Sequence, residues 1–218
     1  MNDQKPGLRA RLVTAGVELV TSEGVHALTL REIARQAGVS HGAPRRYFAT
    51  HAELLAAIAR HGFEELAAAL AAADGTADDG PRARLAAQCR GYLDYTAANP
   101  GMFDLMFRHD ILEGSGTGLR QTTLPMFETF IRLVAEVRPP SGAEPASVAA
   151  ALWANLHGLA QLRSWGSLRL ATGADDIGPL LDTVLAAHLG PDRAARPVPE
   201  QAAHPVPDQP GRPGPVAR

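Results

Sequence analysis

The sequence has 218 residues, of which 45% are apolar and 20% are charged, and its formal net charge is −2 at pH 7. A chain of this length can bury the core of one or two domains. It has no run of about 18 apolar residues, which argues against a membrane-spanning helix, so we expect a cytoplasmic protein with no membrane partner. Cys89 is the only cysteine, which excludes an internal disulfide and a cysteine-based zinc site.

Charge is divided unevenly along the chain. Residues 1–50 carry seven Lys and Arg against four Asp and Glu, whereas residues 51–190 carry ten against sixteen. A basic head on an acidic body would turn the head toward a polyanion such as a nucleic acid, and binding of that kind weakens as salt rises. Chance variation in composition is the alternative explanation for an excess this small.

Apolar residues recur at helical spacing along almost the whole chain, which predicts an all-α fold of about nine helices. The first helix is expected over residues 8–22, because Gly24 is a natural stop just beyond it. Thr29 and Glu32 have the spacing of a capping box, in which each side chain accepts a hydrogen bond from the other residue's backbone N–H. The second helix therefore starts after Thr29, and it ends just before Gly38.

A short third helix is expected next. Ser40 can cap it, and it runs to about Tyr47. Pro44 lies inside it and fits best in a first turn, so the sequence predicts a short or partly 3₁₀ start.

A second capping box, formed by Thr50 and Glu53, opens a long fourth helix over residues 51–73. Gly- and Pro-rich joints separate the later helices, which are expected at residues 81–98, 101–107, 119–137, 146–170 and 179–189. The segment from residue 191 onward holds eight of the 17 prolines and is expected to be disordered. The chain thus divides into a head over residues 1–50, a body over residues 51–190 and a tail over residues 191–218.

Residues 30–48 meet the geometric demands of a helix-turn-helix. Ala34 is the small residue where two helices cross, Gly38 makes the turn, and Val39 covers the small core. The residues placed to fill that core are Ile33, Ala37, Pro44 and Tyr47. The residues that the second helix would offer to the major groove of DNA are His41, Gly42, Ala43, Arg45 and Arg46. An ordinary helical hairpin with a basic end is the alternative.

The segment EGVHALTLREIARQAGVS, followed by a short helix ending in YF and a capped helix beginning HAELLAAI, resembles the DNA-binding domain of the TetR family over the first 60 residues. The resemblance implies a three-helix DNA-binding domain over residues 1–50 and a ligand-sensing and dimerisation domain over residues 51–190. It also implies contacts of the following residues with double-stranded DNA: Thr29, Ser40, His41, Gly42, Ala43, Arg45, Arg46, Tyr47, Thr50 and His51.

Two positions depart from the pattern of this family. Arg45 stands where many members have a tyrosine that packs on the DNA backbone, and His51 replaces the usual lysine at the head of the fourth helix. The expected DNA affinity is therefore lower, or more dependent on pH, than in typical members.

The segment WANLHGLAQL at residues 153–162, together with AANPGMFDLMF from Ala97, is similar to a C-terminal subfamily of TetR proteins named for its Trp-His-Gly motif. In this family the last two helices of each subunit form a four-helix dimer interface. The residues expected there are Trp153, Leu156, Gly158, Leu180, Leu181, Val184, Leu185 and His188. His157 has three open roles: a hydrogen-bonded core or interface histidine, a ligand contact, or a metal ligand. No second ligand stands at metal-binding spacing beside it.

Aromatic and methionine side chains gather in the middle of the body, where the resemblance implies an effector cavity. The residues expected to line it are Phe103, Met106, Phe107, Met126, Phe127, Phe130 and His157. Such side chains suit a small apolar effector, although simple core packing explains them equally well.

The sequence gives little support to an enzyme. Cys89 has no obvious partner base, and GSGTG at residues 114–118 has neither a preceding strand nor a following Lys-Ser/Thr. We therefore expect no catalytic site, no metal and no cofactor. The predicted function is a repressor that binds a palindromic operator as a homodimer and is released by a small molecule. The alternative is a helical protein-interaction module whose helix-turn-helix does not bind DNA.

Overall fold

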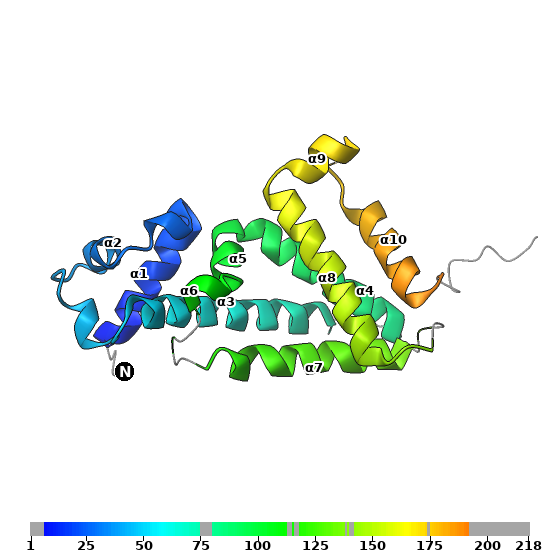
Figure 1. Ribbon diagram of the computed structural model, residues 1–218, viewed down its shortest axis with the longest axis horizontal. Helices are drawn as coiled ribbons and strands as arrows, with labels where there is room; N and C mark the ends of the chain where they lie inside the picture. The colour runs from blue at the N-terminus through cyan, green and yellow to red at the C-terminus, as the bar shows by residue number, and fades with distance from the viewer. Residues whose placement is uncertain are drawn as a thin grey trace, which may run out of the picture.

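Helices build the protein, as Figure 1 shows. The computed structural model describes residues 7–74, 80–112, 115, 118–137, 139, 142–173 and 175–191. Within these residues lie ten α-helices and two short 3₁₀ helices, with no strand, so the predicted all-α fold is confirmed. The predicted disorder of the tail concerns residues that, apart from Pro191, lie outside the described part of the chain.

The N-terminal elements form a compact unit around α1. The elements are α1 (Leu8–Glu23), η1 (Val25–Ala27), α2 (Leu30–Gln36), η2 (Pro44–Arg46) and α3 (His51–Asp74). Leu12 and Leu19 of α1 are buried against α2 and α3, and Gly16 lets α3 approach closely. A Cβ atom at Gly16 would lie 2.2 Å from Cδ1 of Ile58, so no larger residue fits there without movement of that side chain.

Seven further helices complete the described part of the chain. They are α4 (Pro81–Ala98), α5 (Pro100–Met106), α6 (His109–Leu112), α7 (Arg120–Val137), α8 (Pro145–Ser164), α9 (Ser167–Thr172) and α10 (Gly178–Leu189). The long helix α3 runs from the N-terminal unit into the C-terminal one and packs against α4, α5, α6 and α7 (Figure 1). None of the described helices is long and apolar enough to cross a membrane.

Two predicted helices are corrected by the structure. The helix expected over residues 146–170 is broken: α8 ends at Ser164, Gly166 adopts a left-handed backbone with φ of 72°, and α9 starts anew. Glycine adopts this conformation at little cost, and here it redirects the chain toward α10. The third helix expected to run to Tyr47 is only a 3₁₀ turn at Pro44–Arg46. The short helix α6 was not expected.

Candidate functional site: a helix-turn-helix and an apolar cavity

The two predicted helix caps hold the start of α2 and of α3. The Thr29 hydroxyl accepts a hydrogen bond from the Glu32 N–H at 3.1 Å, but the Glu32 carboxylate bonds to Arg35 and does not return to Thr29. At α3 the Thr50 hydroxyl accepts from the Glu53 N–H at 3.0 Å, and the Glu53 carboxylate accepts from the Ala49 N–H at 2.7 Å. The first capping box therefore has only one of its two hydrogen bonds. The second has both, but Glu53 bonds to the N–H of Ala49, one residue before the cap Thr50.

The turn between α2 and the segment that follows is locked from two sides. The Val39 N–H donates to the Ala34 carbonyl at 3.0 Å, and Gly38 has a φ of 66°. The guanidinium of Arg11, from α1, donates to the Ala37 carbonyl at 2.7 Å. This bond satisfies a carbonyl at the end of α2, which has no partner within the helix. The sequence pattern did not single out Arg11, because its partner lies 26 residues away.

Residues 41–47, which we call the reading segment, form a turn and then the 3₁₀ helix η2. The Ala43 N–H donates to the Ser40 carbonyl at 2.9 Å and the Tyr47 N–H to the Pro44 carbonyl at 3.0 Å, both with the three-residue spacing of a 3₁₀ helix. Because Pro44 has no N–H, the segment lacks the donor that an α-helix entering here would use. Ser40 was predicted to cap this segment, but η2 follows Ala43 and starts without a side-chain cap.

The reading segment divides into an exposed and a buried face. Its exposed residues are His41, Gly42, Arg45, Arg46 and Tyr47. Ala43 is only 8% exposed, so, contrary to expectation, it offers no surface to DNA. Tyr47 is 43% exposed and does not fill the small core as predicted; Phe48, at 2%, does so, with Arg9 lying over its ring.

His51 ties the head of α3 to the residue before the first cap. Its Nε2 atom lies 2.6 Å from the Leu28 carbonyl oxygen, so the ring donates a hydrogen bond there. This contact brings the start of α3 beside the start of α2, and with it the two cap residues Thr29 and Thr50. Thr50 also follows the last residue of the reading segment by three positions along the chain.

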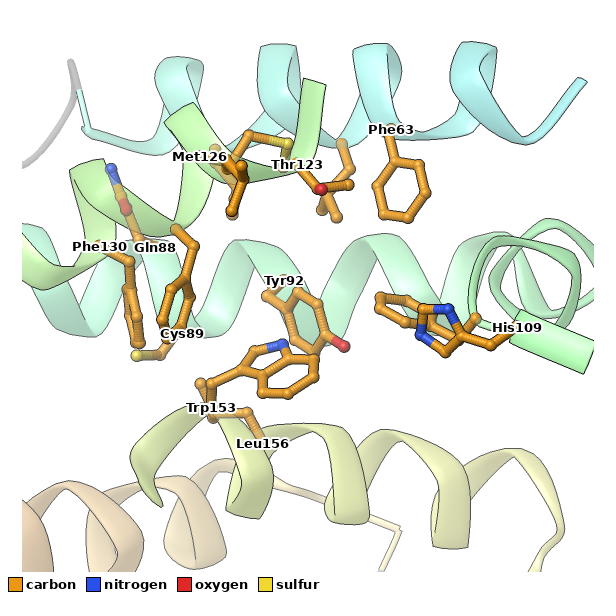
Figure 2. A pocket seen from close by; sticks show the side chains of 15 residues that line it. Phe63, Gln88, Cys89, Tyr92, His109, Thr123, Met126, Phe130, Trp153 and Leu156 are labelled. Atoms are coloured by element: carbon orange, nitrogen blue, oxygen red, sulfur yellow. The ribbon is translucent and has the colours of Figure 1, made fainter. Parts of the chain in front are cut away.

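A cavity of about 320 Å³ lies among α3, α4, α7 and α8. Figure 2 shows Gln88, Cys89 and Phe130 at one end of it, His109 at the other, and Tyr92 with Trp153 between them. The lining residues are Phe63, Leu66, Leu70, Gln88, Cys89, Tyr92, Phe107, His109, Thr123, Leu124, Met126, Phe127, Phe130, Trp153 and Leu156. This volume lies at the lower end of the range of small-molecule pockets.

The structure brings four of the seven predicted cavity residues to its wall: Phe107, Met126, Phe127 and Phe130. Phe103 and Met106 instead fill the core, at 1% and 2% exposure, and do not line the cavity. His157 stands behind the wall. Its Nδ1 atom lies 3.0 Å from the Tyr92 hydroxyl, and its ring centre is 4.6 Å from that of Phe107.

The sequence reasoning missed the contribution of α3 and α4. Phe63, Leu66 and Leu70 belong to the apolar stripe of the long helix, but nothing in that stripe shows that it borders a void. Gln88 interrupts the apolar face of α4, and a polar residue inside such a stripe is the signal that could have marked it.

None of the residues that line the cavity is an aspartate, glutamate, lysine or arginine. Burial raises the pKa of the Cys89 thiol to about 12 and also raises the pKa of the Tyr92 phenol. Desolvation lowers the pKa of His157, which favours its neutral ring beside Tyr92. Among the described residues, no three His, Cys, Asp or Glu side chains converge into a possible metal site.

The residues predicted for a dimer interface are divided between the interior and the surface. Leu156, Leu181 and Leu185 are at most 6% exposed and pack inside the protomer, and Trp153 turns into the cavity wall. Gly158, Leu180, Val184 and His188 are half-buried, and the last accepts a hydrogen bond from Asn155. Trp153 is nevertheless 38% exposed, and three further large exposed apolar residues of this region were not predicted: Leu162, Trp165 and Leu170.

Two family models match the chain. Residues 12–58 match the model for bacterial regulatory proteins of the tetR family, and residues 85–188 match a tetracyclin repressor-like C-terminal domain. The first match spans the helix-turn-helix, and the second spans α4 to α10, including most of the cavity wall.

Curated relatives match less than half of the chain. The HTH-type transcriptional regulator BetI of Burkholderia thailandensis is 36% identical over 88 residues, which cover 40% of this chain and 45% of that protein. The protein of the same name from Ectopseudomonas mendocina is 37% identical over 91 residues, covering 41% and 46%. The chain thus spans about half the length of the curated relatives it matches.

Solved structures are similar over nearly the whole fold. A protein of unknown function from Rhodococcus sp. RHA1 has a TM-score of 0.69 and 29% identity, covering 86% of this chain and 94% of that one. The multidrug binding protein EbrR, solved with imidazole, has a TM-score of 0.59 and 23% identity, covering 90% and 99%, a likeness of fold alone. With both family models matched, the chain belongs to the TetR family of bacterial regulatory proteins, a family of transcriptional regulators and not of enzymes.

Proposed function

We propose that the chain is a transcriptional repressor that binds a palindromic operator as a homodimer, and that a small apolar effector releases it. The observation that carries the proposal is the course of α3. This helix begins at the cap Thr50, beside the reading segment, and its later residues Phe63, Leu66 and Leu70 line the cavity. A ligand that moves the cavity end of α3 therefore changes the position of its DNA end.

The exposed reading segment supports the DNA-binding half of the proposal. Arg45 and Arg46 are both exposed, and an arginine can bind guanine in the major groove or hold a phosphate. The starts of α2 and α3 lie beside them with backbone N–H groups that suit a phosphate. The basic excess of residues 1–50 adds attraction to the DNA as a whole.

The outer face of α8 and its continuation into α9 support the dimer. Leu162, Trp165 and Leu170 are 40%, 67% and 86% exposed. Exposure of this much apolar surface to water is unfavourable, and a partner subunit would bury it. A Cβ atom added at Gly158 would meet nothing within 4 Å, so that stretch of α8 is open to a neighbouring helix. Two-fold pairing would set the reading segments about 34 Å apart, one turn of DNA.

Release requires that the effector prefer the conformation that does not bind DNA. A ligand with equal affinity for both conformations shifts nothing, so a difference of a few kcal/mol is needed. EbrR, the neighbour solved with imidazole, is named as a multidrug binding protein, which supports a ligand-binding role for the shared fold.

The test is binding of the purified protein to fragments of its own upstream DNA at several salt concentrations. The variant Arg45→Ala with Arg46→Ala should lose selective binding. The slope of log K against log salt should become shallower by up to about 4, roughly one for each of the four arginines that the dimer loses. A matched control is Arg90→Ala with Arg120→Ala, which removes the same charge from exposed sites on α4 and α7.

Retained selective binding in the control and its loss in the reading-segment variant would support the proposal. Equal loss of DNA binding in both variants would mean that Arg45 and Arg46 contribute only positive charge and no specific contact. Absence of any selective binding by the unaltered protein would favour the interaction-module alternative.

A further inference from the structure

The polarity of the cavity wall restricts which molecules can occupy it. This inference rests on the proposed function, because it concerns the same effector site. None of the 15 lining residues is an aspartate, glutamate, lysine or arginine. His109 is exposed, and Figure 2 places it at the end away from Gln88. An ionised ligand would therefore leave water without meeting an opposite charge, which costs far more than burying a neutral group.

Gln88 is a buried polar residue in a cavity wall that is mainly apolar. The residue is 7% exposed, and its carboxamide makes no hydrogen bond to any described residue. No fully buried side-chain nitrogen or oxygen among the described residues lacks a partner. The polar atoms of Gln88 are therefore not sealed in the core. They border the cavity, at the end shared with Phe130 (Figure 2).

The two other polar residues that α4 contributes to the cavity wall are already engaged or form only weak hydrogen bonds. The Tyr92 hydroxyl is hydrogen-bonded to His157, and the Cys89 thiol stays neutral because burial raises its pKa to about 12. A thiol is a poor hydrogen-bonding group, whereas a carboxamide has one oxygen acceptor and two N–H donors. Gln88 thus offers a ligand both kinds of hydrogen bond deep inside an aromatic wall.

We infer that the cavity binds an uncharged, mainly apolar molecule with one hydroxyl, carbonyl or amide group, and that the Gln88 carboxamide hydrogen-bonds to this group. The apolar part would lie along Phe63, Phe107, Phe127 and Trp153, toward the end of the cavity at His109. Carboxylates and protonated amines of the same skeleton would be rejected.

The experiment uses four probes with one skeleton: 4-pentylbenzyl alcohol, 4-pentylbenzoate, 4-pentylbenzylammonium and 4-pentyltoluene. Calorimetric titration of each into the full-length protein, without DNA, measures the four affinities. The alcohol should bind at least about a hundredfold more tightly than either ion, because each ion loses its hydration without a partner. The hydrocarbon should bind less tightly than the alcohol by about the factor of 2 to 10 that one hydrogen bond provides.

Two substitutions of Gln88 sharpen the test. Gln88→Leu keeps the apolar volume and should remove the preference for the alcohol over the hydrocarbon. Gln88→Glu should raise the affinity for the ammonium probe relative to the benzoate, a gain that misfolding cannot produce. Gln36→Leu is the matched control, since Gln36 is exposed on α2 and bonds only to Glu18, outside the cavity.

The two proposals fail in different ways. Equal binding of the ions and the alcohol, no binding of any probe up to its solubility limit, or an unchanged preference in Gln88→Leu would each overturn the inference. DNA release is measured separately on the operator fragment. Selective binding of the alcohol without DNA release would keep the inference and overturn the proposed effector role of the cavity. Release of DNA by the ions as well as by the alcohol would keep the proposed effector role and overturn the inference that the cavity rejects ions.

Discussion

The Thr29 hydroxyl caps the start of α2 and stabilises this helix. It accepts the Glu32 N–H, and Glu32 gives nothing in return because its carboxylate is bonded to Arg35. Replacement by alanine leaves that N–H without its acceptor, so Thr29→Ala should lower the free energy of unfolding by about 1 kcal/mol. Urea denaturation should give a lower midpoint with an unchanged slope.

The conservative change Thr29→Ser is the control, because serine keeps the hydroxyl and caps helices well. It should recover most of the loss. If Thr29→Ser were as unstable as Thr29→Ala, the methyl group and not the hydrogen bond would be the stabilising feature.

His157 makes stability depend on pH in a defined direction. Its pKa in the folded protein is lowered by desolvation, so the unfolded chain binds a proton at a higher pH than the folded one does. The wild type should therefore lose stability as pH falls from about 7.5 to about 5.5, through the ordinary pKa of histidine near 6.5. His157→Gln keeps an acceptor for the Tyr92 hydroxyl and should lose less.

The measurement is urea denaturation of both proteins at the two pH values. Carboxylates contribute equally to both, so the difference between the two losses isolates His157. An equal loss in wild type and variant would mean that the histidine is as well solvated in the folded state as in the unfolded one.

Single residues were predictable from the sequence where their partners are close in the chain. Thr29 and Thr50 were found because a cap and its N–H are three residues apart. Phe103 could not be separated from Phe107 in the same way, since both are aromatic residues of one short segment. Only the packing of α5 against its neighbours decides that one fills the core and the other borders the cavity.

At the scale of elements, α5 is a second link between the cavity and the DNA-binding unit. Its C-terminal neighbour Phe107 lines the cavity, while its first turn packs against α1 and η1. The contact depends on Gly101, where a Cβ atom would lie 2.3 Å from the Val20 carbonyl oxygen and 3.2 Å from the Gly24 Cα. Both neighbours are backbone atoms, so they cannot rotate away.

Gly101→Ala should therefore push α5 away from α1 and lower the free energy of unfolding by about 1 to 3 kcal/mol, as other overpacked sites do. Denaturation in urea measures the loss. Gly42→Ala is the control for stability, because a Cβ atom there meets nothing within 4 Å. A Gly101→Ala protein as stable as Gly42→Ala would show that the approach of α5 to α1 is loose.

Element boundaries followed the sequence closely where a local stop was present. The helix expected over residues 81–98 is observed at Pro81–Ala98, between Gly80 and Asn99. The break at Gly166 could not be read in the same way, because a glycine near the end of an apolar helix is compatible with continuation and with a turn. The choice comes from the packing of α9 and α10 back onto α8 and α4, which no local pattern contains.

At the scale of the whole molecule, the exposed apolar side chains are unevenly placed. Leu162 lies on α8, Trp165 at the α8–α9 turn and Leu170 on α9. Figure 1 shows these two helices apart from α1 and α2, which belong to the basic residues 1–50. The sequence predicted which helices pair in a dimer, but it did not predict their exposed apolar residues. An apolar stripe does not show which of its residues are already buried within the subunit.

A change at this face tests the dimer. Leu162→Glu places a carboxylate in the proposed interface, where it would be buried without a partner, and should weaken dimerisation by about a hundredfold or more. Sedimentation velocity over a range of protein concentrations measures the dissociation. Because a dimer binds both half-sites at once, the same variant should lose affinity for the full operator and keep its weaker affinity for a single half-site.

Ala97→Glu is the control, since Ala97 is exposed on α4 and belongs neither to this face nor to the cavity wall. It should stay dimeric and keep its operator affinity. If both variants remained dimeric, the subunits would pair through another surface, and the apolar side chains of α8 and α9 would need a different partner. Loss of half-site binding in Leu162→Glu as well would indicate damage to the fold and not to the interface, because the reading segment belongs to the N-terminal unit and not to α8.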